Sequence, residues 1–93
     1  MKTKTEQCVL DAATGFLEPL RVRTDFTTSR IAILKDGTPK AVLLLLAEEK
    51  MGGSIPPTLF PFWIDGDMRN ETLANVDFAE RQQPLMPRKK RPA

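Results

Sequence analysis

Residues 30–46 constrain the fold more than any other segment, because two apolar runs flank a tight-turn signal. Residues 30–35 (RIAILK) are apolar and β-branched, and residues 40–46 (KAVLLLL) are almost wholly apolar. Asp36-Gly37 lies between them and tolerates the positive φ angles of a hairpin turn. The pattern predicts two paired strands, the second covered on both faces. Residues 47–51 are then expected to open a short helix that Gly52 and Gly53 end.

Helical spacing of apolar residues predicts one or two short helices outside this hairpin. The first lies within residues 5–20, after a short strand or arm, and its apolar positions are Leu10, Ala13, Leu17 and Leu20. The second covers residues 69–81, with inward positions at Leu73, Val76 and Phe78. Residues 58–64 contain Pro61 at their centre, so we expect an edge strand or an extended segment there.

The length of 93 residues allows one small domain. Six of the eight prolines follow Gly52-Gly53-Ser54, a density that prevents long regular elements. We therefore expect a small α+β domain built on the hairpin, with an extended Pro-rich C-terminal arm. Within it, residues 1–53 are expected to form a compact unit that dimerises or binds DNA. Residues 54–93 are expected to form a partner-binding segment with a basic tail.

Composition argues against most catalytic mechanisms. Histidine and tyrosine are absent, and Cys8 is the only cysteine. The absence of histidine excludes His-based acid–base catalysis, Ser–His and Cys–His nucleophilic pairs and nearly every zinc site. Asp65 and Asp67 make a poor metal pair because no third ligand is near them in the sequence. We expect no catalytic residue, no cofactor and no metal, with Cys8 acting as a small buried hydrophobe.

No segment of the sequence has the pattern of a membrane span or a signal peptide. The longest apolar run, residues 41–47, has seven residues, whereas a bilayer-crossing helix needs about 20. Lysines near the N-terminus are not followed by an apolar stretch. The expectation is a soluble, cytoplasmic protein with no membrane partner.

Basic residues gather at the C-terminus and in the first third of the chain. The last six residues carry four basic side chains and no acid, a pattern typical of a solvated arm that binds nucleic acid or an acidic partner. Arg21 and Arg23 would point to one face of an extended segment. The candidate DNA contacts are Lys2, Lys4, Arg21, Arg23, Arg88, Lys89, Lys90 and Arg91, with Arg30 a further member of this basic surface. The alternative is that these charges only aid solubility.

Large apolar and acidic side chains meet in residues 58–67. The candidate partner-binding residues are Phe60, Phe62, Trp63, Ile64, Asp65 and Asp67. The apolar ones either insert into a groove of a partner or complete the core of this chain, which needs most of its large side chains at this size. The acids, together with Glu71, Asp77 and Glu80, either face a basic site on a partner or form the solvated face of a helix.

Residues 37–43 (GTPKAVL) carry a family resemblance. They match a Gly-x-Pro-x-Ala-Val-Leu core, and residues 47–49 (AEE) stand where an acidic helix start follows it. With the apolar strand before the turn, this segment resembles the prevent-host-death (Phd/YefM) antitoxins. Residues 12–20 (AATGFLEPL) can be laid over a helix of that family, so the resemblance covers residues 8–50.

The resemblance implies an α+β domain whose strands pair into a homodimer that binds operator DNA. It also implies a C-terminal segment, disordered alone, that wraps and neutralises a toxin. We therefore expect a non-enzymatic, antitoxin-like protein that masks a toxin and represses its own operon. Two other classes stay open. One is a small phage- or plasmid-type inhibitor that blocks a host nucleic-acid enzyme or defence complex, and the other is a small subunit of a larger assembly.

Overall fold

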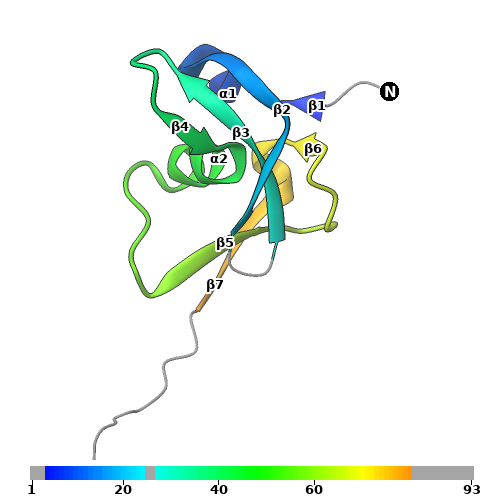
Figure 1. Ribbon diagram of the computed structural model, residues 1–93. Helices are drawn as coiled ribbons and strands as arrows, with labels where there is room; N and C mark the ends of the chain where they lie inside the picture. The colour runs from blue at the N-terminus through cyan, green and yellow to red at the C-terminus, as the bar shows by residue number, and fades with distance from the viewer. Residues whose placement is uncertain (1–3, 25–26, 81–93) are drawn as a thin grey trace, which may run out of the picture.

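Helices and separate small sheets make up the fold, which confirms the predicted α+β class (Figure 1). The computed structural model describes residues 4–24 and 27–80. In chain order the elements are β1 (Lys4–Thr5), α1 (Gln7–Ala12), β2 (Ala13–Thr24), β3 (Thr27–Leu34), β4 (Pro39–Ala41), α2 (Val42–Met51), β5 (Leu59–Trp63), β6 (Asn70–Glu71), the 3₁₀ turn η1 (Leu73–Asn75) and β7 (Val76–Glu80). The last part of the expected C-terminal arm, residues 81–93, lies outside the described residues.

The predicted hairpin turn is confirmed. β2, β3 and β4 form an antiparallel sheet in that order, and β3 pairs with β4 through Ile31 opposite Ala41 and Ile33 opposite Pro39. Gly37 has a φ of 89°, which a residue with a Cβ rarely adopts. The Thr38 amide donates to the Asp36 carboxylate at 2.9 Å, so the aspartate closes the turn.

The predicted second strand, residues 40–46, is wrong beyond its first two residues. β4 ends at Ala41 and helix α2 begins at Val42. Within α2, four residues are fully buried, namely Val42, Leu43, Leu46 and Ala47. Separations of three and four residues between them place them on one face of a helix. Leucine, alanine, glutamate and lysine are strong helix formers, so this composition favours a helix over a strand.

Both ends of α2 are satisfied by hydrogen bonds. At its start, the Leu43 amide donates to the buried Ser29 hydroxyl of β3 at 2.9 Å, which replaces a local N-cap. At its end, Gly52 is left-handed and its amide donates to the Glu48 carbonyl at 2.8 Å, as the sequence predicts for these glycines. No helix in the described part of the chain is long and apolar enough to cross a membrane.

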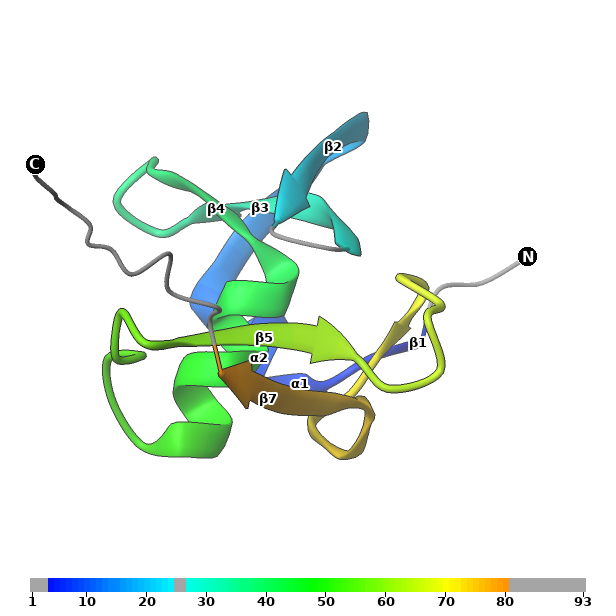
Figure 2. The same cartoon turned by 90° about the horizontal axis from the view of Figure 1, so that it is seen from below.

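Helix α2 lies between the β2–β3–β4 sheet and the β5–β7 strand pair (Figure 2). It contacts β3 on one side and both β5 and β7 on the other. The buried core accordingly draws on both halves of the chain, and its members are Val9, Ala32, Val42, Leu43, Leu46, Ala47, Trp63 and Val76. Residues 59–80 therefore pack on the same core as the hairpin.

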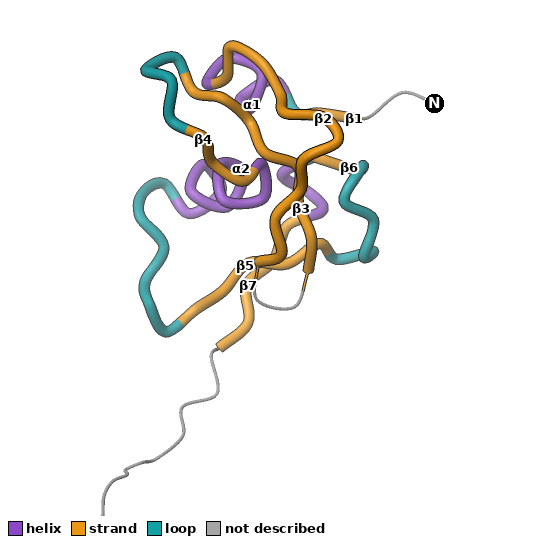
Figure 3. Tube along the Cα trace, in the orientation of Figure 1, coloured by secondary structure: helices purple, strands orange, loops and turns teal. Residues whose placement is uncertain are grey.

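Both helices predicted outside the hairpin are largely wrong (Figure 3). The first exists only as α1, and the chain from Ala13 to Thr24 is strand β2. Gly15 and Pro19 disfavour a helix there, and Phe16 and Val22 favour a strand. In place of the second helix, residues 70–80 form β6, η1 and β7. The short strand expected before the first helix is β1, which pairs in parallel with β6.

Candidate partner-binding site

A mostly apolar hollow of about 450 Å³ opens beside the aromatic segment that the sequence singles out. Its lining residues are Thr27, Phe60, Phe62, Trp63, Gly66 and Ala79. Three of the six predicted partner residues therefore line one site. Thr27 comes from the start of β3 and Ala79 from β7, so the hollow depends on tertiary folding.

Strand register explains which side chains face the hollow. β5 and β7 are antiparallel, with Phe60 opposite Ala79 and Phe62 opposite Asp77. Residues opposite each other share a face of the strand pair, so these four side chains lie on one face. Trp63 pairs with Val76 on the other face, toward the core. Asp77 is exposed, so a carboxylate lies beside Phe62 on the face of the hollow.

Trp63 forms the wall between the core and the hollow. Its indole Nε1 donates to the Thr28 carbonyl at 2.8 Å, and the side chain is 3% exposed. Phe60 is also buried, and its ring centroid lies 6.4 Å from that of the half-buried Phe62. Trp63 thus belongs to the core cluster, whereas Phe60 is buried on the strand face that it shares with Phe62. Ile64 is 55% exposed and does not line the hollow.

The turn after β5 carries two carboxylates that are already engaged. Asp65 accepts hydrogen bonds from Asn70 Nδ2 at 3.0 Å, the Asp67 amide at 2.8 Å and Asn75 Nδ2 at 2.9 Å. These hydrogen bonds lower the pKa of Asp65, and the bond from Asn70 has the largest effect. Asp65 therefore stays ionised at lower pH than a free aspartate. Asp67 pairs with Arg69 at 3.3 Å. The acidic turn is therefore held in one conformation.

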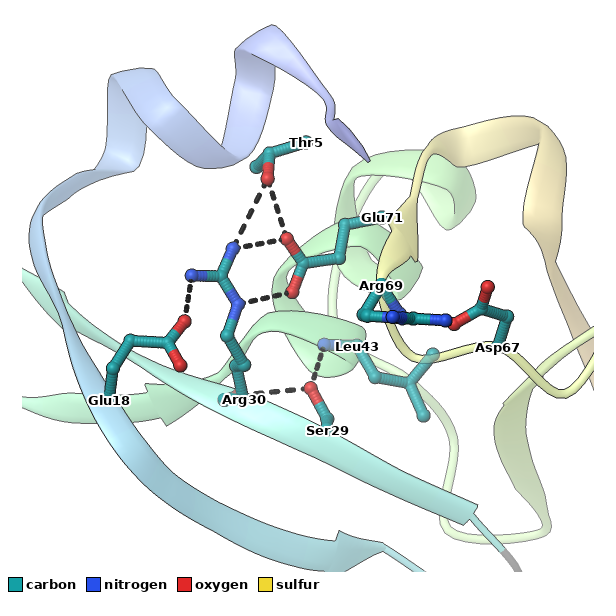
Figure 4. A network of polar contacts seen from close by, with 8 residues as sticks. All are labelled: Thr5, Glu18, Ser29, Arg30, Leu43, Asp67, Arg69 and Glu71. Carbon is teal, nitrogen blue, oxygen red and sulfur yellow. Dashed lines mark hydrogen bonds and ion pairs between the residues drawn. The ribbon is translucent and has the colours of Figure 1, made fainter. Parts of the chain in front are cut away.

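The interpretation of the acids as one solvated helix face is wrong, because Glu71 is fully buried in an ion network (Figure 4). Arg30 Nε donates to Glu71 Oε2 at 2.9 Å, and Arg30 Nη2 also pairs with Glu71 Oε1. Arg30 Nη1 pairs with Glu18. The Thr5 hydroxyl donates a hydrogen bond to Glu71 Oε1 at 2.6 Å and accepts one from Arg30 Nη2 at 3.2 Å. The guanidinium lies 4.2 Å from the centre of the Phe16 ring.

This network joins β1, β2, β3 and β6 around one guanidinium. Hydrogen bonding to Glu71 raises the pKa of Arg30 above its usual range, with Glu18 adding to the shift, so the side chain stays charged. Arg30 is only 8% exposed. The prediction that Arg30 belongs to a basic surface is therefore wrong. Its guanidinium is buried and paired with two carboxylates, so an external ligand cannot reach it.

The other predicted basic residues divide into exposed and undescribed ones. Lys4, Arg21 and Arg23 are exposed, and both arginines lie on the outer strand β2 as an extended segment predicts. Arg21 Nη1 donates to the Pro19 carbonyl at 3.3 Å. The remaining candidates lie outside the described residues, namely Lys2, Arg88, Lys89, Lys90 and Arg91.

Cys8 is half-buried on α1, beside a second hollow that it shares with Glu48, Glu49 and the glycines after α2. Burial, with smaller effects from Glu49 and Glu6, raises the pKa of the thiol. The thiolate is the reactive form, so this environment opposes nucleophilic chemistry. Across residues 4–24 and 27–80, no three His, Cys, Asp or Glu side chains gather as a metal site.

The segments that carry the antitoxin resemblance fall on different elements. Residues 37–43 span the hairpin turn, β4 and the first residues of α2, so a strand, a turn, a strand and a helix follow one another there. The resemblance implies a helix over residues 12–20, but residues 13–20 lie in strand β2. No family model, curated protein or solved structure matches this chain.

Proposed function

We propose that this chain is a non-enzymatic binding protein that holds a protein partner at the hollow beside Phe62 and Trp63. The observation that carries the proposal is the hollow itself, an apolar site of about 450 Å³. The exposed Asp77 lies opposite Phe62 on the same face of the strand pair. Apolar hollows with a few polar groups at the rim are typical binding sites. Tryptophan is enriched among the residues that dominate binding energy, and phenylalanine is enriched at protein–protein interfaces.

The antitoxin resemblance supplies the kind of partner within this proposal. An antitoxin-like protein would use the hollow to mask a toxin, and strands of its first half would pair two copies. In the resembling family the toxin-binding segment orders on binding. Here residues 59–80 already pack against α2, so the proposed contact surface is folded before the partner arrives. A preorganised surface loses less conformational entropy on binding.

Replacing Phe62 with serine is expected to abolish partner capture. The substitution removes the half-buried aromatic wall of the hollow, and a contact of this kind is worth at least about 2 kcal/mol at a binding hot spot. The full chain and the variant would each be used to capture proteins from the native host, with identification by mass spectrometry. Thermal unfolding of the variant, followed by circular dichroism, would check that it still folds.

Leu20→Ser provides the matched control. Leu20 is a large apolar side chain on β2, is 56% exposed and does not line the hollow, so this variant should capture the same protein as the wild type. Capture of a small basic protein by the wild type and Leu20→Ser, but not by Phe62→Ser, supports an antitoxin-like function. The same capture pattern for a nucleic-acid enzyme supports the function of an inhibitor. A partner that Phe62→Ser retains refutes the hollow as the binding site.

DNA binding is a second candidate function, favoured by the exposed pair Arg21 and Arg23 on β2. Phosphate contacts from two such arginines give an affinity that falls with salt. The double variant Arg21→Ala/Arg23→Ala is expected to weaken a mobility shift of the upstream DNA and to lower the salt slope by roughly two. Arg69→Ala, which removes an exposed arginine bound to Asp67, should leave the shift unchanged. No shift by the wild type at low salt would exclude this function.

A further inference from the structure

We propose that the hollow recognises a basic segment of its protein partner, in which one large apolar side chain is flanked by lysine or arginine. The apolar side chain would enter the hollow, and Asp77 would bind a flanking cation. This inference rests on the proposed function, because it specifies the ligand of the same site. It places Asp77, one of the acids that the sequence singles out, beside Phe62 and adds Thr27 and Ala79 to the site.

The walls of the hollow select the apolar part of the ligand. Phe62 and Trp63 present ring surfaces, and Ala79 and Gly66 add little bulk. The polar groups of the neighbouring indole are already satisfied, since Trp63 Nε1 donates to the Thr28 carbonyl. A polar side chain entering here would lose its hydration without gaining a hydrogen bond from Trp63. An aromatic or branched aliphatic side chain carries no such cost.

Asp77 selects the charged part of the ligand. Its carboxylate accepts a hydrogen bond from the Phe78 amide at 2.8 Å, and no lysine or arginine of the described chain pairs with it. It lies on the face of Phe62, opposite it in the strand register. A carboxylate placed beside an apolar hollow strengthens binding of a cation next to the inserted side chain.

The surrounding charges have the same sign. Asp65 and Asp67 flank Gly66, which lines the hollow. Between residues 51 and 80 the only basic residue is Arg69, whose guanidinium pairs with Asp67. Lys50 reaches β7, but its ammonium donates to the Val76 carbonyl at 2.6 Å and the Leu73 carbonyl at 3.2 Å. The rim therefore presents excess negative charge to an incoming segment.

This charge pattern excludes two other ligands. A second copy docked through the same face would place Asp77 and its acidic neighbours against themselves, and like charges at an interface are unfavourable. Nucleic acid would bring phosphates to the same carboxylates. The chain contains one basic segment of its own, residues 81–93, with Leu85 and Met86 as apolar residues. The experiment below separates that occupant from a partner.

Fluorescence of Trp63, the only tryptophan of the chain, tests the inference directly because its indole lines the hollow. The full chain would be titrated with the peptide Ac-Lys-Arg-Phe-Arg-Lys-amide at low salt. We expect a saturable change in emission. Replacing the central phenylalanine of the peptide with alanine should weaken binding roughly tenfold or more, because burial of an aromatic side chain is lost.

Asp77→Asn tests the charge. The amide keeps an acceptor for the Phe78 amide but removes the negative charge, so binding of the basic peptide should weaken about threefold to tenfold at low salt. This difference should shrink at 0.5 M salt, where the Debye length is only about 4 Å. Asp11→Asn is the control, since Asp11 is an exposed carboxylate on α1 that contacts Gln7, and it should leave the affinity unchanged.

The outcomes separate the inference from the proposed function. Equal affinity for Ac-Gln-Ser-Phe-Ser-Gln-amide would overturn the charge recognition and leave the hollow as a binding site. The absence of a saturable change with the basic peptide would also overturn the inference. Binding only after Leu85→Ser/Met86→Ser would show that the chain's own segment occupies the hollow. The proposed function fails by a different measurement, namely capture of the same partner by Phe62→Ser.

Discussion

Replacing Arg30 with methionine is expected to lower the free energy of unfolding by about 3–5 kcal/mol, because the change leaves the buried Glu71 carboxylate without its cation. Glu71 is fully buried, whereas Glu18, the other carboxylate on Arg30, is 46% exposed at its side chain. Once Arg30 is removed, water can therefore hydrate the charge of Glu18 but not that of Glu71. Loss of the network also removes a contact that ties Thr5 of β1 to β3.

Chemical denaturation of the full chain measures this effect. Lys40→Met is the control, because the Lys40–Glu48 pair is partly exposed at both side chains and is expected to contribute less than about 1 kcal/mol. The double variant Arg30→Met/Glu71→Leu should recover most of the lost stability, since no buried charge remains. Equal losses for Arg30→Met and Lys40→Met would show that the network does not hold the fold.

Leu43→Ala and Leu46→Ala are each expected to cost about 2–5 kcal/mol of stability, because each removes a fully buried side chain from the core. Leu44 and Leu45 are only partly buried, so their alanine variants should cost distinctly less. The four variants are matched in chemistry. They differ only in their position around α2.

The pattern of the four losses distinguishes a helix from a strand, and thermal or denaturant unfolding measures it. In a helix, Leu43 and Leu46 share the buried face and lose the most. In a strand, side chains alternate, so Leu44 would match Leu46 and Leu43 would match Leu45. The second pattern would contradict the helix that separates the sheet from the β5–β7 strand pair.

The sequence is enough to predict the fold class, the Asp36-Gly37 turn and the helix end at Gly52, because each depends on local chemistry. It misleads where local patterns are degenerate. A run of four leucines fits a buried strand and a buried helix equally well by periodicity alone. The better signal is composition, since leucine, alanine, glutamate and lysine dominate residues 41–50 and favour a helix.

Strand β7 has only a short sequence signal. Val76 is buried and Asp77 is exposed, as alternation in a strand predicts, but Phe78 and Ala79 are both half-buried, so the pattern does not continue. The ion network was not detectable, because Arg30 and Glu71 are 41 residues apart and only the fold brings them together. Lone charged residues in a sequence are usually solvated, so burial of this pair depends on tertiary packing.

The candidate site was predictable in part. Three large aromatic residues, Phe60, Phe62 and Trp63, lie close together in the sequence and indicated a binding segment. All three line the hollow. Thr27 and Ala79 could not be assigned, because only tertiary folding brings β3 and β7 to the hollow. Asp77 was among the candidate acids, but its place beside Phe62 depends on the pairing of β5 with β7. Asp65 and Asp67 were predicted as contacts, and the structure shows them bonded mainly within their own turn.

Hydroxyl-radical footprinting of the full chain, alone and with its captured partner, tests the central claim most directly. Oxidation is read out at individual side chains by mass spectrometry. We expect the partner to protect Phe62, which lines the hollow, and to leave the exposed Leu20 and Val22 of β2 as reactive as in the free chain. Protection of Leu20 and Val22 with Phe62 unchanged would contradict this claim and place the partner on β2.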